Sequence, residues 1–434
     1  MSELNEQNLI AHYASQHQHL LTSAEPDWLK FYRAKAFETF TENGIPTTAV
    51  EAWKYTQLRT WHKNKFHQHP KHAQLPELYE LQLFSMLDEH CQEVIVLDGV
   101  LQTKISDNNA MQIMDFKHAL KTEEPLLQSY LGQAVNHDEH PFVSLCDALA
   151  EQGIVVIVPE NIVVDKPLHI LYVSSKNSEN CVNHLRNLII VGKHSKVEII
   201  EHFVDLHDVT YFTNHVTEVI LEENASLSHY KLEQEGNKSF HIGGIHVKQN
   251  RGSDFCSNAV TISGHFSRHD IATTMVEESA NCTLNGLYFT HNQQHVDYHT
   301  TIHHDAPHCH SSSVYKGILT DKSSSVFNGK VVVKHGAQKT ASKQENHNLL
   351  LSESCEANSK PELEIYTDDV KCAHGATTGQ LDEEALFFLQ SRGLALSKAR
   401  RMLIRAFAND VFNQMPSSIV RDYCQRYLEM AAYE

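Results

Sequence analysis

The stretch Leu188-Ile-Ile-Val191-Gly-Lys-His-Ser195-Lys-Val197-Glu-Ile-Ile200 places two short apolar runs on either side of a polar turn. Both runs are rich in β-branched residues, which is typical of strands. Similar runs occur at 94–97, 153–158, 216–221 and 331–333, with no long helical period after residue 150 until the C-terminal part of the chain. The sequence therefore predicts a mainly β protein whose strands follow one another for more than two hundred residues.

A short motif recurs in this region: a small residue, one spacer, and an apolar residue that opens a strand. The steps between successive apolar residues are 30, 28, 27 and 32 residues. A strand unit that cannot bury its own face and repeats at a near-constant period is typical of a β-solenoid. An ordinary β-sandwich with coincidental spacing is the alternative. The motifs are Ser195-Lys-Val197, Ala225-Ser-Leu227, Ser253-Asp-Phe255, Ala280-Asn-Cys282 and Ser312-Ser-Val314.

Helical patterns are expected near the two ends of the chain. Residues 26–44 have helical apolar spacing with Gly44 as a stop, and another helix is expected near 75–90. After residue 381, Asp382-Glu-Glu should open one helix that ends at Gly393, Ser397 should cap a second, and a third should follow Pro416. We therefore expect an N-terminal helical region (1–90), a β-helix core (91–378) and a C-terminal helical region (379–434).

Composition excludes several classes of protein. The 54 acidic residues outnumber the 36 basic ones, which disfavours nonspecific binding to nucleic acid. No run approaches 18 apolar residues, so we expect no membrane span. The polar N-terminus does not resemble a signal peptide, and nine cysteines without framework spacing suggest free thiols in a reducing cytoplasm. No phosphate-binding loop, dinucleotide fingerprint or nucleophile elbow occurs, so any nucleotide chemistry must come from a partner.

The densest group of the 32 histidines lies between His291 and His310. Imidazole is a good ligand for zinc or iron, and on a strand His295 and His299 would share one face, as would His308 and His310. The spacing matches no zinc signature, however, and polar side chains on a solenoid wall also hydrogen-bond one another. Metal binding and a structural role both stay open for these four histidines.

Cys372-Ala-His374 is a sharper candidate. On a strand these side chains point to the same side, so a thiol and an imidazole could meet one ligand. A protonated neighbouring histidine would also favour the thiolate form. Cys309 and Cys355 are more simply read as buried free cysteines.

Residues 360–393, which include Lys371-Cys-Ala-His-Gly-Ala-Thr377, resemble the SufB/SufD family of iron–sulfur cluster assembly proteins. Further motifs follow the same family's pattern, in the same order, and the N-terminal Ala52-Trp-Lys-Tyr-Thr56 resembles the SufD type. The upstream motifs are His295-Val-Asp-Tyr-His-Thr300, Tyr315-Lys-Gly-Ile-Leu319, Val326-Phe-Asn-Gly-Lys330, Gly336-Ala-Gln-Lys-Thr340 and Asn348-Leu-Leu-Leu-Ser352.

This resemblance implies a right-handed parallel β-helix between helical termini and a scaffold role without catalytic residues of its own. It implies pairing with a SufB-like paralogue through the last strands and docking of a SufC-like ATPase on the C-terminal helices, and it leaves open whether the isolated chain forms a homodimer. At the SufB–SufD interface a transient iron–sulfur cluster would form or iron would bind. His374 matches the histidine proposed there as a ligand, and Cys372 matches the cysteine two residues before it. The family also allows a reduced flavin on the assembled complex.

The expected second C-terminal helix presents Met402, Leu403, Ala406 and Phe407 on one side. This face could cap the solenoid or dock the ATPase. Three other functions remain as alternatives: a SufB-like scaffold that accepts sulfur itself, a freestanding histidine-rich metalloprotein, and a solenoid enzyme acting on carbohydrate. The last would usually carry a secretion signal and a groove of paired acids, and neither is present.

Overall fold

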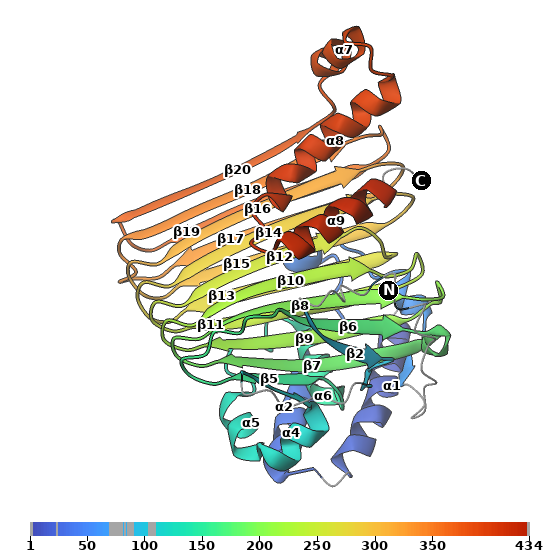
Figure 1. The fold of residues 1–434 in the computed structure, drawn as a ribbon. Helices are drawn as coiled ribbons and strands as arrows, with labels where there is room; N and C mark the ends of the chain where they lie inside the picture. Colours follow the sequence, from blue (N-terminus) through green and yellow to red (C-terminus); the bar gives the residue numbers. More distant parts are fainter. Residues whose placement is uncertain are drawn as a thin grey trace.

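The computed structural model describes residues 3–22, 25–68, 81, 84, 91–102 and 110–431. The chain forms a mainly β solenoid of about eight turns. Two ten-stranded sheets make its walls, and consecutive long strands alternate between them (Figure 1). This winding confirms the predicted solenoid and excludes the β-sandwich, because each strand pairs with strands one full turn away.

Sheet A runs in the order β19-β17-β15-β13-β11-β9-β7-β5-β4, and β1 (His67–Gln68) also pairs with β7. Its strands are parallel except for the β4–β5 pair. They are β4 (Gln112–Asp115), β5 (Ile154–Val158), β7 (Cys181–Val191), β9 (Phe212–Leu221), β11 (Phe240–Gln249), β13 (Phe266–Met275), β15 (His295–His304), β17 (Ser324–Val333) and β19 (Glu356–Ile365).

Sheet B runs in the order β20-β18-β16-β14-β12-β10-β8-β6-β2-β3 and is parallel except for the β2–β3 pair. Its strands are β2 (Gln92–Leu97), β3 (Val100–Leu101), β6 (Leu168–Ser174), β8 (Lys196–Asp205), β10 (Ser226–Gln234), β12 (Asp254–Thr261), β14 (Asn281–Thr290), β16 (His310–Leu319), β18 (Thr340–Leu350) and β20 (Val370–Gly379).

The repeat is in register over its first four members. Val197, Leu227, Phe255 and Cys282 are successive partners in sheet B. The fifth assignment was wrong, because Cys282 pairs with Ser311 and not with Val314. Ser311 faces inward but is polar: its hydroxyl contacts Nε2 of His304 at 2.9 Å and donates to Ser342 Oγ at 2.8 Å. This turn therefore lacks the apolar residue that opens the strand in the other turns. Ser312-Ser-Val314 matches the motif by chance, three residues out of register.

The register also explains Cys309 and Cys355. Cys309 occupies the buried corner held by Ser195, Ala225, Ser253 and Ala280 in the preceding turns of sheet B. Cys355 takes the matching corner of sheet A, directly before β19. Both are buried free cysteines, as expected, and a small side chain is needed there because the chain turns tightly between strands.

The N-terminal region packs on the outer face of sheet A. Its helix α2 (Asp27–Asn43) agrees with the prediction for residues 26–44, but α1 (Glu3–Leu21) was not predicted, because only a few apolar residues interrupt its polar sequence. The range 91–378 is not continuous β structure, since three helices lie at 116–149. The expected helix near 75–90 lies largely outside the described residues. The helices are α4 (Phe116–Thr122), α5 (Glu124–Tyr130) and α6 (Pro141–Leu149), and short 3-10 turns occur at Glu51–Trp53, Trp61–Lys63 and Lys176–Ser178.

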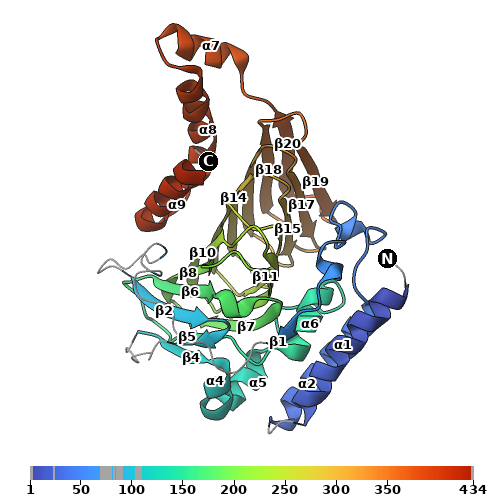
Figure 2. The same ribbon diagram turned by 90° about the vertical axis from the view of Figure 1, so that its right-hand side faces the viewer.

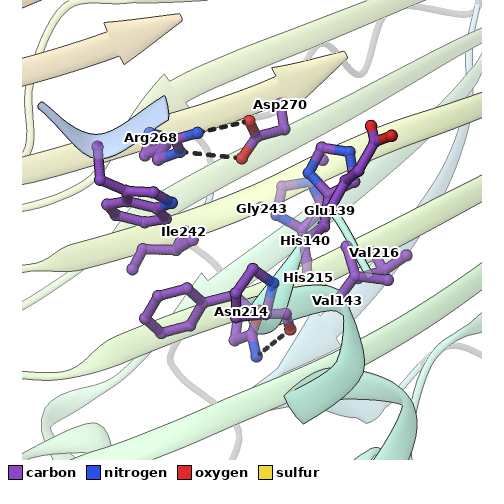
Figure 3. A pocket seen from close by; sticks show the side chains of 14 residues that line it. Glu139, His140, Val143, Asn214, His215, Val216, Ile242, Gly243, Arg268 and Asp270 are labelled. Carbon is purple, nitrogen blue, oxygen red and sulfur yellow. Dashed lines mark hydrogen bonds and ion pairs between the residues drawn. The ribbon is translucent and has the colours of Figure 1, made fainter. Parts of the chain in front are cut away.

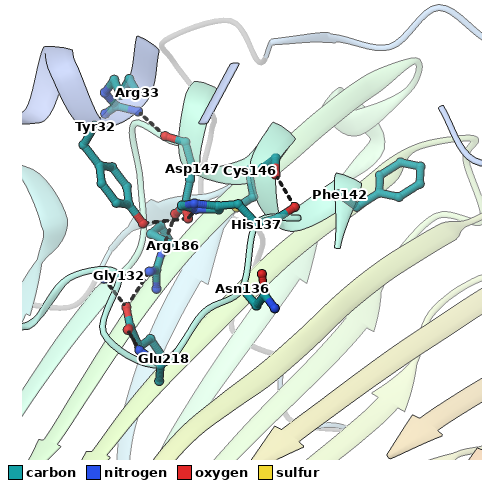
Figure 4. A network of polar contacts seen from close by, with 12 residues as sticks. Tyr32, Arg33, Gly132, Asn136, His137, Phe142, Cys146, Asp147, Arg186 and Glu218 are labelled. Atoms are coloured by element: carbon teal, nitrogen blue, oxygen red, sulfur yellow. Dashed lines mark hydrogen bonds and ion pairs between the residues drawn. The ribbon is translucent and has the colours of Figure 1, made fainter. Parts of the chain in front are cut away.

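A buried network of charges fastens α2 and α6 to sheet A (Figure 4). Arg186 on β7 donates to Asp147 of α6 and to Glu218 of β9, each at 2.5 Å. The Tyr32 hydroxyl of α2 donates to the same Asp147 carboxylate at 2.7 Å. Burial raises the pKa of Asp147, but Arg186 and the other partners outweigh it and the pKa falls well below its usual range. The carboxylate therefore stays charged and holds three elements together.

The C-terminal helices are α7 (Glu383–Ser391), α8 (Leu396–Phe412) and α9 (Ser418–Ala431). Asp382 caps α7 through its side chain and Gly393 follows it with φ +88°, as predicted. Helix α8 begins at Leu396 after Ala395, so Ser397 is not its cap. Helices α8 and α9 bury Val411, Phe412 and other apolar residues against the outer face of sheet B, while α7 projects beyond the last strand (Figures 1 and 2). No helix among the described residues is long and apolar enough to span a membrane.

Candidate functional site

The last turn of the solenoid is open. Among the described strands, β20 pairs only with β18, and β19 only with β17. All residues of β19 and β20 are partly or fully exposed, whereas the preceding turns bury most of theirs. An edge strand presents unpaired backbone N–H and C=O groups, which invite pairing with another strand. At this end of the molecule both sheets therefore end in an exposed, unpaired edge strand.

The predicted pair Cys372 and His374 lies on β20. Cys372 pairs with Ser342 and His374 with Gln344, so both follow the inward-facing row of β18. Cys372 packs partly on the solenoid core, and His374 is exposed beyond it. Burial raises the pKa of the Cys372 thiol, contrary to the expectation that a neighbouring histidine would lower it. In the isolated chain this cysteine is therefore a protonated thiol at neutral pH.

Polar groups inside the solenoid continue up to this edge. The Ser311 and Ser342 hydroxyls form a ladder that ends below Cys372. Both side-chain polar atoms of Gln344, below His374, are buried and without a hydrogen-bond partner among the described residues. The edge thus offers a thiol, an imidazole and an unsatisfied amide in adjacent positions.

The predicted docking residues on α8 divide into two groups. Met402 and Ala406 are exposed, and Leu403 lines a groove with Phe387 and Phe388 of α7. Phe407 instead contacts the solenoid, because the Lys316 ammonium of β16 lies 4.5 Å from its ring centroid. The prediction did not include Phe387 and Phe388, which are 73% and 56% exposed. Their signal was present in the sequence, since Leu386, Phe387 and Leu389 form an apolar helix face.

The structure does not gather the four predicted histidines into one site. His295 contacts the Ser324 hydroxyl at 2.8 Å and the Thr56 hydroxyl at 3.0 Å, while the His299 ring lies 2.9 Å from Asp297. His308 belongs to the turn before β16, with φ +61°, and His310 opens that strand. Within the described residues, no grouping of three ligand atoms within 4.8 Å of one another includes these histidines.

The motif Ala52-Trp-Lys-Tyr-Thr56 clamps the N-terminal region to sheet A. The Trp53 ring lies over Arg268, and Arg268 Nη1 donates to the Ala52 carbonyl at 2.7 Å. Arg268 borders a small pocket (Figure 3). Arg268 also forms a paired contact with Asp270 at 2.9 and 3.0 Å. The Thr56 hydroxyl donates to Asp297 at 2.6 Å. Because these charges are paired and buried, the arrangement is a structural joint.

Fold and edge together define the class of protein: a two-sheet β-solenoid with an open last turn and an exposed helical arm. Two family models match the chain, the SufBD protein N-terminal region over residues 3–170 and the SufBD core domain of SUF system FeS cluster assembly over residues 173–407. The chain therefore belongs to the SufBD family of iron–sulfur cluster assembly proteins.

Individual relatives agree with this assignment. The chain is 29% identical over 400 residues to the iron–sulfur cluster assembly protein SufD of Escherichia coli, which covers 92% of both chains. It is 29% identical to an iron–sulfur cluster assembly SufBD family protein of Synechocystis sp., covering 93% of this chain and 91% of the relative. SufD of Bacillus subtilis is 26% identical over 428 residues, which is 95% of this chain and 94% of the relative.

Proposed function

We propose that this chain is a non-catalytic, SufD-like scaffold subunit of an ATP-driven iron–sulfur cluster assembly complex. Its last solenoid turn would pair with a SufB-like paralogue, and its C-terminal helices would bind a SufC-like ATPase. Iron and sulfide would meet at the shared edge. The open strand β20, which carries Cys372 and His374 on its inner row, is the observation on which this proposal rests.

The chemistry of the edge supports iron as the cargo. An imidazole suits iron, and a thiol becomes a good iron ligand once it loses its proton. Cys372 is protonated in the isolated chain because burial raises its pKa, and a bound cation would favour the thiolate. His374 is exposed and lies at the strand that would join a partner. We therefore assign His374 as a ligand and Cys372 as a second donor recruited when iron arrives.

The helical arm supports an ATPase-docking role. Phe387 and Phe388 on α7 and Met402 on α8 are exposed apolar side chains. The two phenylalanines line one groove and Met402 lines a second one on the same helical arm. Helix α8 continues onto the outer face of sheet B and contacts β14 and β16. A force applied to the arm by nucleotide-driven movement would reach the turns that contain β14 and β16 directly.

Replacement of His374 by alanine in the co-purified three-subunit complex tests the site. The complex should keep its mass and composition, while its iron and sulfide content after anaerobic reconstitution falls several-fold. Lys371→Ala, an exposed neighbour on the same strand, is the matched control. Unchanged cluster content in an intact His374→Ala complex would remove His374 from the mechanism.

The SufB-like alternative is separated by persulfide analysis. A scaffold that accepts sulfur itself would carry persulfide on one of its own cysteines after incubation with a cysteine desulfurase system. We expect mass spectrometry of this subunit to find none, with persulfide confined to the SufB-like partner.

A further inference from the structure

A polar cluster fills part of the solenoid interior, far along the chain from the Cys372–His374 edge. Lys231 and Glu233 lie on the inner row of β10, Glu235 follows that strand, and His241 lies opposite on β11. All four residues are at most 2% exposed. Around it the interior holds apolar side chains such as Val197, Ile199 and Val219, and further along the solenoid it holds uncharged polar ones such as Ser342 and Gln344. A concentrated charged group in such a core needs a specific reason.

The carboxylates and the imidazole converge on one point. One ligand atom from each of Glu233, Glu235 and His241 lies within 4.8 Å of the other two. His241 Nδ1 is 2.5 Å from Glu235 Oε2, and His241 Nε2 is 2.9 Å from His215 Nδ1. A cation placed between the three residues would need only small side-chain movements to reach all of them. His241 would turn its Nδ1 lone pair to the cation and donate its Nε2–H to His215, as metal-bound histidines commonly do.

Several atoms around this point lack partners. Glu233 Oε1, His215 Nε2 and both ring nitrogens of His269 are buried and have no hydrogen-bond partner within the described part of the chain. An unsatisfied buried polar atom costs stability, and a native core contains few of them. Gly243 separates His215 from His269 on the neighbouring strand, and a Cβ atom there would lie 2.0 Å from the His215 ring. The sequence thus keeps room around these imidazoles.

The charges of the cluster also favour a cation. Glu201 faces His229 at 2.9 Å, and Glu233 faces the Lys231 ammonium at 2.5 Å. The Glu235 carboxylate accepts from the Thr213 hydroxyl at 3.0 Å, contacts the His241 ring, and has Tyr211 and Lys231 nearby. A bound divalent ion would balance the negative charge of the Glu235 carboxylate.

Two cavities lie on the side of this cluster that faces the first turns of the solenoid. A small cavity beside Glu235 is lined by Tyr172, Phe203 and Thr213. It shares lining residues with a larger pocket bordered by the acidic side chains of Asp98, Asp115 and Glu151. The shared residues are Val96, Gly99, Asn183 and Leu185.

We propose that the solenoid core holds one divalent transition-metal ion, bound by Glu233, Glu235 and His241, with His215 supporting His241. Two carboxylates and one imidazole are ligands that suit iron(II), manganese(II) and zinc(II). This site is separate from the open edge, contains no thiol, and does not depend on a SufB-like partner.

The full-length chain, stripped of metal by a chelator, should bind one equivalent of cobalt(II) or zinc(II). The cobalt(II) spectrum should show nitrogen and oxygen ligation without a thiolate charge-transfer band. Glu235→Gln and His241→Asn should each weaken binding by roughly 100-fold or more. His304→Asn, a buried interior histidine outside the cluster, and Cys372→Ala should bind normally.

The proposal would be overturned by no stoichiometric binding by the folded wild-type chain, by normal binding by both cluster variants, or by a thiolate band in the wild-type spectrum. Circular dichroism checks that the variants fold. If they do not fold, the test uses the wild-type chain alone. A metal that binds only the native state raises the unfolding temperature as the metal concentration increases. A thiolate-free spectrum without that rise would also contradict binding in the core.

Discussion

The indole ring of Trp53 lies over the guanidinium group of Arg268, with Arg268 Cζ 3.8 Å from the ring centroid. Trp53 belongs to the short N-terminal aromatic segment, whereas Arg268 lies on β13 in the middle of the solenoid. The contact joins the region matched by the N-terminal family model to the region matched by the core-domain model, through a buried aromatic ring and a buried charge. Because both partners are large and enclosed, the joint should be sensitive to truncation.

Trp53→Ala should therefore destabilise the protein by about 3–5 kcal/mol, the usual cost of removing a large buried aromatic side chain. Denaturant unfolding measures the change, and hydrogen exchange should show loss of protection in residues 51–66. Tyr55→Ala is the matched control, because Tyr55 is 43% exposed and should change stability little. Normal protection of 51–66 in Trp53→Ala would contradict the role of this contact.

Arg186→Met should cost about 3–5 kcal/mol, because it leaves the buried carboxylates of Asp147 and Glu218 without their cation. Lys117→Met is the control: the Lys117–Glu151 pair is exposed and 3.7 Å long, so its loss should cost less than about 1 kcal/mol. Thermal unfolding of the two variants compares them. Equal shifts would mean that the network in Figure 4 does not fasten α2 and α6.

Two aspartate substitutions should separate the proposed partners. Ile365→Asp, at the open end of β19, should abolish co-purification with a SufB-like subunit while preserving the ATPase. Phe387→Asp, on the exposed face of α7, should do the reverse. Both side chains are exposed, at 40% and 73%, so neither change should unfold the chain. Loss of both partners in either variant would refute separate docking surfaces.

Cys309→Ser should change stability by less than about 1 kcal/mol, whereas Cys309→Leu should cost about 1–3 kcal/mol through overpacking. Ser195 and Ser253 hold the same corner in other turns, and each hydroxyl donates to a nearby backbone carbonyl. Denaturant unfolding of both variants measures the difference. A large loss in Cys309→Ser would show that the sulfur has a role beyond filling the corner.

The pH dependence of stability should report on His184, which burial holds at a pKa of about 3. Its contribution is fully present above the ordinary histidine pKa of about 6.5 and is lost as pH falls toward 3, because the unfolded chain then binds the proton first. Between pH 7 and 5 the wild-type chain should lose about 2 kcal/mol more than His184→Gln. Parallel pH profiles would show that His184 does not titrate in this way.

The solenoid could be predicted because its signal is local. Inward and outward residues alternate along each strand, and small residues return at the sheet B corners Ser195, Ala225, Ser253 and Ala280. The prediction failed where a turn departed from that pattern, at the polar Ser311. The helices at 116–149 and α1 were missed for a related reason: tertiary contacts with sheet A and the N-terminal segments, more than a conspicuous local period, decide that they are helical.

The edge pair was also visible in the sequence, because Cys372 and His374 are two residues apart on one strand. The protonation state of Cys372 was not, since it depends on how the last turn buries the thiol. Phe387 and Phe388 illustrate the same limit: their apolar character was plain, but only the arrangement of α7 beyond the solenoid leaves them exposed.

By itself, the sequence determined the repeating strand unit, the helical ends and the family motifs, because each depends on residues close together along the chain. Only the tertiary structure brought Glu233 and Glu235 to His241 and placed Trp53 on Arg268. Those contacts depend on the ladder register and on how many residues each turn consumes. A strand period of two specifies which side a residue faces, but it does not specify which residue of another strand it will meet.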